Sequence, residues 1–278
     1  ETLFVFENTG IYSSLLALVL SENSLDYAQV PALEIKRSLG ITRGKSDKVD
    51  AKEIAHYAKR NTDKIALSTL PELSLQQLKI VFAEREKTVA AIKTFERTKE
   101  NEMFLTKEVF NSVKAINNQT VKHLKKQLVM LDEKIRTLIR EDENLYGQQQ
   151  LLKSIPGIGD ITSVYILMAT KGFTAFTSGR KFACYSGVAP FEHSSGTSIK
   201  GKTRVSHLAD KKMKTLLHMA SLTAIKYDPE LKDYYNRKKA EGKHTMLVLN
   251  NIKCKMVYRI FAVIQRKSNF VNLHKFAA

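Results

Sequence analysis

Residues 184–204 read CYSGVAPFEHSSGTSIKGKTR and carry two adjacent serines, Ser194 and Ser195, directly before Gly196. Glycine and proline punctuate this stretch, which predicts a loop. A hydroxyl group on a glycine-flanked loop beside many cations is a candidate nucleophile for a phosphate. The competing interpretation is a polar connector, because serine and glycine are common in connecting segments of any function.

Positive charge is concentrated in the last part of the sequence. The net charge is +17, and residues 200–278 hold 18 Lys and Arg against five Asp and Glu. Such an excess favours a polyanionic partner, most often nucleic acid. We therefore predict a nucleic-acid contact surface that includes Lys200, Lys202, Arg204, Lys211 and Lys212.

A membrane surface is the main alternative partner for a basic chain. The sequence has no apolar run near about 18 residues, and it shows no signal peptide or lipidation motif. Cys184 and Cys254 lie far apart and form no CxxC pattern, which argues against a zinc site and a disulfide framework. These features favour a reducing cytoplasm.

The first 30 residues have the pattern of a βαβ unit. Residues 2–6 predict a buried strand, residues 11–20 a helix, and residues 25–30 a second, parallel strand. Glu7 comes at the carboxyl end of the first strand, where open α/β sheets place their ligands. A solvated glutamate at a strand end is the alternative interpretation.

Two aspartates open the next predicted helix, which covers residues 45–60 with Ser46 as its N-cap. Asp47 and Asp50 are three residues apart and share one helical face. They are either first-turn acids that complement the helix dipole or ligands for a cation. With Glu7 they would supply three carboxylates for Mg²⁺, and paired Mg²⁺ ions about 4 Å apart commonly activate phosphodiester oxygens.

Residues 71–147 form a region of long helical patterns. A helix is predicted over residues 73–104, a polar break at residues 111–119, and an end of the region at Gly147. The apolar residues after the break are spaced as a heptad seam: Val121, Leu124, Leu128, Leu131, Ile135 and Leu138. This pattern predicts either a helical hairpin within the chain or a coiled coil that joins two copies.

The remaining residues predict a mainly helical domain. Its Pro-Gly-Ile-Gly turn lies between two apolar helical patterns and resembles a helix-hairpin-helix, in which backbone N–H groups at Gly157 and Gly159 would hold a phosphate. A helix–turn–helix that serves only packing is equally compatible with the pattern. Further helices are predicted over residues 178–186, 210–227, 229–241 and 245–266.

Five motifs follow one another along almost the whole chain. They are E-N-T-G-x-Y at residues 7–12, K-S-D-K-V-D-A-K at 45–52, I-P-G-I-G-D at 155–160, Y-S-G-V-A-P-x-x-x-x-S-G at 185–196 and Y-D-P at 227–229. In these motifs and their order the chain resembles the insertion-sequence transposases of family one-ten, which include the Piv DNA invertases. Members of that family pair an N-terminal RuvC-like domain, which carries a DEDD carboxylate set, with a C-terminal serine domain.

The resemblance implies a fold of class α/β plus α. Residues 1–70 would be an incomplete RNase H/RuvC-like α/β domain that lacks its first strands. Residues 71–147 would be a long helical hairpin or coiled coil. Residues 148–278 would be a mainly α serine transposase domain with a helix-hairpin-helix-like segment.

The resemblance also implies roles for single residues. Glu7 matches the glutamate of the carboxylate set, and Asp47 and Asp50 match its last two aspartates. The first aspartate of the family lies on an earlier strand and has no counterpart here, so we expect the native protein to begin upstream. Ser195 matches the catalytic serine, and a shift of one residue would select Ser194 instead.

The implied function is DNA transposition or site-specific recombination with Mg²⁺ as cofactor. Ser195 would attack a DNA phosphodiester, and the resulting phosphoserine would conserve the bond for rejoining. The implied partners are double-stranded DNA at the element ends and target, a guide RNA, and further copies in a dimer or tetramer. The implied location is the bacterial cytoplasm, at the nucleoid. A structure-selective RuvC-like nuclease that uses water, and a truncated, non-catalytic nucleic-acid-binding remnant, are the alternatives.

Overall fold

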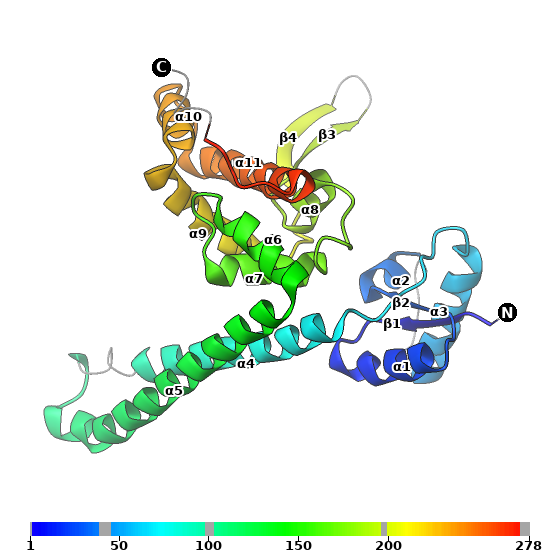
Figure 1. Cartoon of the computed structure of the whole chain (residues 1–278), viewed down its shortest axis with the longest axis horizontal. Helices are drawn as coiled ribbons and strands as arrows, with labels where there is room; N and C mark the ends of the chain where they lie inside the picture. The colour runs from blue at the N-terminus through cyan, green and yellow to red at the C-terminus, as the bar shows by residue number, and fades with distance from the viewer. Residues whose placement is uncertain (1, 39–45, 98–102, 196–198, 273–278) are drawn as a thin grey trace. The chain divides into compact units, whose positions relative to one another are not determined.

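The computed structural model describes residues 2–38, 46–97, 103–195 and 199–272. The chain divides into two compact units, Glu1–Glu72 and Leu73–Ala278, and Figure 1 labels their helices and strands. The described residues are mostly helical, with one two-stranded sheet in each unit. None of the described helices has the length and apolar character needed to cross a membrane.

The first unit contains the predicted βαβ unit. Strands β1 (Phe4–Glu7) and β2 (Tyr27–Val30) are parallel, and α1 (Ile11–Glu22) connects them. Helices α2 (Ala32–Ser38) and α3 (Asp47–Arg60) follow, and α3 packs against β1 and α2. Ser46 caps α3 as predicted, because its hydroxyl oxygen accepts a hydrogen bond from the backbone N–H of Val49. The RuvC-like identity of this unit stays a prediction.

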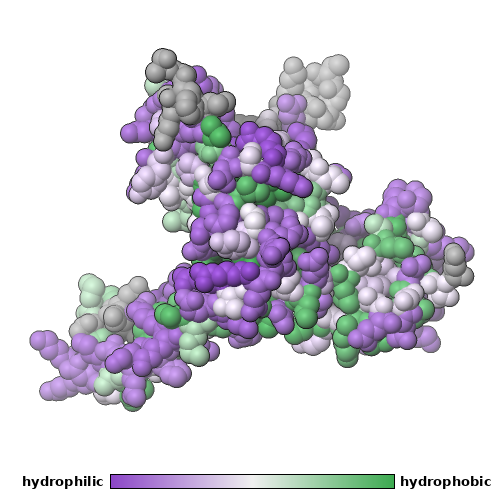
Figure 2. Space-filling view, viewed as in Figure 1, coloured by the Kyte–Doolittle hydropathy of each residue, from purple (hydrophilic) through white to green (hydrophobic). Residues whose placement is uncertain are grey.

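The core of the first unit is small. Two clusters of buried side chains form it, one around Leu20 and Tyr27 and the other around Val30 and Tyr57. Helix α1 supplies Ala17 and Leu20 to the first cluster, but Ile11 at its first position is 70% exposed, and several of its leucines are also exposed. Hydrophobic residues accordingly gather over α1 on the face drawn in Figure 2.

The second unit begins with an antiparallel helical hairpin. Helices α4 (Leu73–Arg97) and α5 (Lys107–Glu141) lie side by side along most of their length (Figure 1). Arg85 pairs with Asp132 at 2.6 Å and Glu96 with Lys125 at 2.7 Å, which fixes the antiparallel register. The predicted pairing of two helices within the chain is therefore confirmed.

Two predicted boundaries in this region are wrong. Residues 111–119 are not a break, because α5 runs through them without interruption. They contain Asn, Ser and Gln but neither glycine nor proline, and each polar residue costs a helix at most about 0.7 kcal/mol. Gly147 does not end the region either, since it lies inside α6 (Glu143–Lys153); the chain bends instead at Asp142, the N-cap of α6.

The rest of the second unit is a helical domain with one β-hairpin. Helix α11 (Thr245–Arg266) packs against α6, α8 (Gly179–Tyr185), α9 (Lys211–Tyr227) and α10 (Pro229–Ala240), and α7 (Asp160–Thr170) packs on α6 and α9. Helices α8 to α11 are the ones predicted over residues 178–186, 210–227, 229–241 and 245–266. Helices α6 to α11 enclose one large core, whose centre includes Phe182, in ring contact with Phe176 and Phe261.

The Y-D-P motif joins α9 to α10. Asp228 is buried, caps α10 by accepting a hydrogen bond from the Leu231 backbone N–H, and forms an ion pair with Arg259 of α11. Pro229 occupies the first position of α10, where its fixed φ angle favours a helix and no N–H is needed. The motif therefore has a structural explanation, which is the junction of three helices.

Candidate functional site

The segment that carries Ser195 is a β-hairpin and not the predicted loop. Strands β3 (Pro190–Ser195) and β4 (Ile199–Val205) are antiparallel, with Ser195 opposite Ile199 at the end nearest the connecting residues. β-Branched residues alternate along β4 at Ile199, Thr203 and Val205, a strand signal that the glycines and serines obscured. The side chains of Ser194 and Ser195 lie outside the described part of the structure.

The base of this hairpin is fastened to the helical core. The backbone N–H of Asp210 donates to the carbonyl of Tyr185 at 2.9 Å, and the side-chain amide of Asn250 donates to the carbonyl of Val188 at 2.9 Å. Gly187 has φ +63°, and a Cβ atom there would lie 2.4 Å from Cβ of Ala209. This glycine of the Y-S-G-V-A-P motif is thus required where the two ends of the segment meet.

Asp210 is the centre of a hydrogen-bond network that sequence reasoning missed. Its carboxylate accepts bonds from the hydroxyls of Tyr165 and Tyr185 at 2.8 and 2.7 Å, and from the Met213 backbone N–H at 2.8 Å as N-cap of α9. Desolvation, followed by the hydrogen bond to this carboxylate, raises the pKa of both tyrosines above the ordinary value of 10.0, so both hydroxyls remain donors at alkaline pH as well. The sequence placed Asp210 only at the start of a predicted helix, because Tyr165 and Asp210 are 45 residues apart.

The three predicted metal ligands lie on two adjoining elements of the first unit. Glu7 is partly buried at the carboxyl end of β1, Asp47 is exposed at the first position of α3, and Asp50 is partly buried one turn later. Helix α3 packs on β1. The part of the chain that the structure describes contains no group of three or more His, Cys, Asp or Glu that could hold a metal ion. In this arrangement the three carboxylates do not form a complete metal site.

The Pro-Gly-Ile-Gly turn connects α6 to α7, as expected. Gly157 has φ +94°, and a Cβ atom there would lie 2.4 Å from the carbonyl oxygen of Ala220 in α9. Gly159 is exposed, and an added Cβ would meet nothing within 4 Å. Asp160 opens α7 and pairs with Lys153 at 2.5 Å, which places a carboxylate near the predicted phosphate position. The packing role of Gly157 is therefore clear, and phosphate binding stays a prediction.

The predicted cationic residues have different surroundings. Arg204 is exposed on β4, and Lys211 is exposed at the first position of α9. Lys212 is partly buried and forms an ion pair with Glu86 of α4. The side chains of Lys200 and Lys202 lie outside the described residues. Lysines in the first turn of α9 are unfavourable for the helix dipole, and the acid at this end of the helix is its N-cap, Asp210.

Two family profiles match the chain. A profile of DEDD-type IS110 elements, described as "Transposase", matches residues 1–101, and the profile "Transposase IS116/IS110/IS902 family" matches residues 149–236. They cover the segments that hold Glu7, Asp47 and Asp50 and, in the second profile, Ser195, in the order that the motifs predicted.

Individual relatives agree with the profiles. The pilin gene-inverting protein of Moraxella bovis is 28% identical over 271 residues, which are 96% of this chain and 81% of the relative. A 42-kDa protein of insertion element IS900 from Mycobacterium paratuberculosis is 33% identical over 134 residues, which are 46% of this chain and 33% of that protein. A 43.6-kDa protein of insertion element IS110 from Streptomyces coelicolor is 33% identical over 100 residues, or 36% and 24% of the two chains. The chain belongs to the IS110/IS116/IS902 family of transposases.

Proposed function

We propose that the protein is a DNA transposase or site-specific recombinase that cleaves and rejoins DNA through a phosphoserine intermediate. The observation that carries the proposal is the agreement of two independent transposase profiles with a similarity to a pilin gene-inverting protein across 96% of the chain. The name of that relative describes a DNA rearrangement in which strands are broken and rejoined. The net charge of +17 supports a nucleic-acid partner.

Ser195 is the proposed nucleophile. Its Oγ forms a bond to a DNA phosphorus atom, the bond from phosphorus to the 3′-oxygen breaks, and that oxygen leaves with a proton as a 3′-hydroxyl. A 3′-hydroxyl then attacks a phosphoserine, which rejoins DNA and regenerates the serine. Its support is the Y-S-G-V-A-P-x-x-x-x-S-G motif, which lies within residues 149–236 that the transposase profile matches.

Glu7, Asp47 and Asp50 are the proposed ligands for a divalent metal ion, with Mg²⁺ as the expected ion. Their support is the DEDD-type profile over residues 1–101 and the contact of α3 with β1. When bound, the ion would stabilise charge on the phosphodiester oxygens. The described carboxylates do not complete such a site, so we derive no step that passes through the metal.

A covalent-adduct assay tests the nucleophile. The protein is incubated with labelled DNA that contains an element end, with Mg²⁺ and the element-encoded RNA, and protein–DNA adducts are resolved under denaturing conditions. We expect Ser195→Ala to abolish the adduct and Ser194→Ala, the matched control, to retain it. Cleavage that persists in Ser195→Ala would instead favour a nuclease that uses water. Tight, salt-sensitive binding without any adduct would indicate a binding protein.

Substitution of each carboxylate by its amide tests the proposed metal ligands. We expect Glu7→Gln, Asp47→Asn and Asp50→Asn each to slow strand cleavage by at least about 100-fold while DNA binding is retained. Asp63→Asn removes an exposed carboxylate from the same unit and should leave the rate unchanged. Equal rates of strand cleavage in all four variants would contradict the assignment of the three carboxylates as metal ligands. Isothermal calorimetry with Mg²⁺ provides a readout that is independent of cleavage.

The proposed partners beyond DNA are a guide RNA and further copies of the chain. The exposed Arg204 and Lys211 support a polyanion partner, since neither is paired with an acid among the residues that the structure describes. Light scattering with and without the element RNA and DNA would measure the assembly, which we expect to be a dimer or tetramer. A protein that stays monomeric with both nucleic acids would contradict this part of the proposal.

A further inference from the structure

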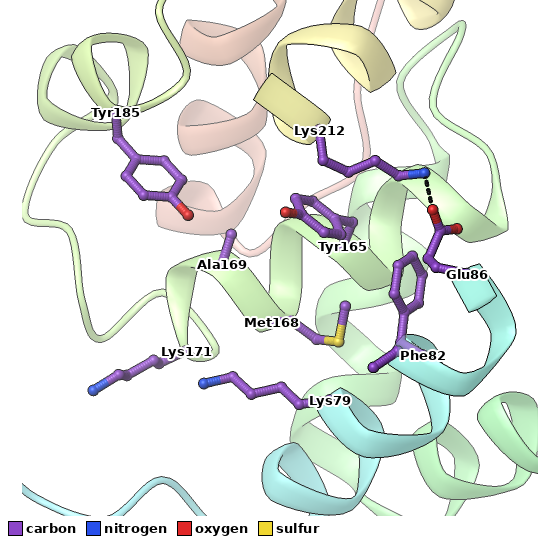
Figure 3. A pocket seen from close by; sticks show the side chains of 10 residues that line it. Lys79, Phe82, Glu86, Tyr165, Met168, Ala169, Lys171, Tyr185 and Lys212 are labelled. Carbon is purple, nitrogen blue, oxygen red and sulfur yellow. Dashed lines mark hydrogen bonds and ion pairs between the residues drawn. The ribbon is translucent and has the colours of Figure 1, made fainter. Parts of the chain in front are cut away.

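A pocket of about 530 Å³ opens beside the base of the serine hairpin. Residues from α4, α7, α8 and α9 line it, so all of its walls belong to the second unit. Its volume falls in the range of small-molecule sites, roughly 300–1,000 Å³. Figure 3 shows the side chains that surround it.

The pocket is positively charged at one end. The ammonium groups of Lys79 and Lys171 lie at the same end in Figure 3, whereas Lys212 pairs with Glu86 at the other end. Among the described residues no carboxylate forms an ion pair with Lys79 or Lys171. Desolvation, and then the charge of Lys171, lowers the pKa of Lys79. An anion bound between the two ammonium groups would relieve their mutual repulsion.

The remaining walls are apolar and aromatic. Phe82, Met168 and the ring of Tyr165 form one side, and Tyr185 contributes a ring that is 37% exposed. The hydroxyls of both tyrosines already donate to Asp210, so the rings are held in place and their polar atoms are satisfied. A ligand that fits must therefore combine an apolar, flat body with an anionic group at one end.

We propose that this pocket binds a single unpaired nucleotide of a DNA strand, with its base against Tyr185 and Met168 and its phosphate between Lys79 and Lys171. A nucleotide combines a flat base with a phosphate, and aromatic side chains stack on any base. Only an unpaired or extruded nucleotide can reach a concave pocket, because a paired base is enclosed in the duplex stack. This inference rests on the proposed function, which supplies the DNA strand. Tyr185, which lines the pocket, also fastens the base of the hairpin that carries Ser195.

Binding of single strands tests the pocket without any cleavage. Fluorescence anisotropy would compare the full-length protein on a labelled thymidine homopolymer, on an abasic strand of equal length, and on a duplex. We expect the homopolymer to bind at least about tenfold more tightly than the abasic strand, whose phosphates are unchanged. Equal affinity for these two strands would mean that only backbone phosphates are bound, and it would overturn the proposal.

Charge variants locate the phosphate. We expect Lys79→Gln and Lys171→Gln each to weaken homopolymer binding about tenfold. Lys93→Gln removes an exposed charge from the same helix, α4, outside the pocket, and should change binding less than about twofold. If all three variants weaken binding equally, the two lysines act only through the net charge and the proposal fails.

Ring variants and cross-linking locate the base. Tyr185→Phe keeps the ring and should retain binding, whereas Tyr185→Ala should lose about tenfold. A strand that contains 5-iodouracil should cross-link to Tyr185 under ultraviolet light in the wild-type protein, as mapped by mass spectrometry. Cross-links confined to other regions would overturn the assignment. The covalent adduct at Ser195 is measured separately: its absence with intact strand binding would refute the proposed function and leave the pocket standing.

Discussion

The two units of the chain differ in how much apolar surface each one buries. The core of the second unit is continuous from the α4–α5 hairpin to α11, and side chains such as Phe182 and Ile252 are fully buried. The first unit has two clusters of three buried residues each, and Ile11 and Leu15 of α1 remain about 70% exposed. The comparison indicates that the second unit folds on its own core, whereas the first holds its carboxylates on a weaker support.

The largest expected effect is the loss of a central ring from the second unit. Phe182→Ala should lower the free energy of unfolding by about 3–5 kcal/mol, because the cavity is enclosed by Phe176, Phe261 and Tyr185. Leu20→Ala in the first unit should cost about 2 kcal/mol, since its small cluster can collapse. Hydrogen exchange resolved by mass spectrometry would measure each unit separately. Equal losses in the two units would contradict the comparison.

A buried ion pair is the next test of the second unit. Asp228→Ala should destabilise it by about 3 kcal/mol, because Arg259 loses its buried partner and α10 loses its cap. The matched control is Glu230→Ala, which removes the exposed partner of the same arginine and should cost less than about 1 kcal/mol. Urea unfolding followed by circular dichroism gives both values. A control as damaging as Asp228→Ala would show that burial is not the cause.

Two glycines of the Pro-Gly-Ile-Gly turn, only two residues apart, should differ in how much an added methyl group destabilises the protein. Gly157→Ala should destabilise the second unit by about 2 kcal/mol, since a Cβ atom would clash with the Ala220 carbonyl and the φ angle is positive. Gly159→Ala meets no neighbouring atom and should change stability by less than about 1 kcal/mol. DNA binding by both variants separates packing from phosphate contact. A loss of binding in Gly159→Ala with unchanged stability would support the phosphate interpretation.

The smallest expected effect is a pH-dependent bond in the first unit. The Tyr57 hydroxyl donates to Glu34 at 2.6 Å, and this bond, with burial, raises the pKa of Tyr57 to about 12. Because the folded pKa lies above the unfolded value of 10.0, the contribution is complete below pH 10 and is lost as the pH rises through about 12.

Tyr57→Phe should therefore lower the free energy of unfolding of the first unit by about 1 kcal/mol at neutral pH. It should also remove the loss of stability that deprotonation of Tyr57 causes at alkaline pH. Tyrosinate absorbance during a pH titration would measure the shift, with Tyr12→Phe, an exposed tyrosine of the same unit, as control. Identical alkaline unfolding of Tyr57→Phe and the wild type would contradict this assignment.

Local patterns predicted most of the elements but not their junctions. The cap at Ser46, the parallel strands before it and the last three helices depend on residues near one another in sequence, and the structure confirms them. The serine segment was wrongly predicted as a loop, because its glycines concealed the alternation of Ile199 and Thr203. The polar break in α5 was wrong because polar residues alone do not end a helix.

The candidate site was predictable only in part, because motifs describe residues that are near one another in sequence. Motif spacing identified Ser195, Glu7, Asp47 and Asp50 as candidates, and their catalytic and metal-binding roles stay predictions. Spacing could not show that Asp210 receives the hydroxyls of two tyrosines. Nor could it show that Lys79 of α4 and Lys171 after α7 share one end of a pocket.

The sequence by itself determined the family, the sign of the charge and the order of the helices, because motifs, composition and helical periodicity are local properties of a chain. Only the tertiary structure decided why Gly157 and Gly187 are glycines and that Lys79 and Lys171 lie at the same pocket. These properties depend on close approaches between segments that are tens of residues apart. Such contacts form only when the helices pack, and no local pattern in the sequence encodes them.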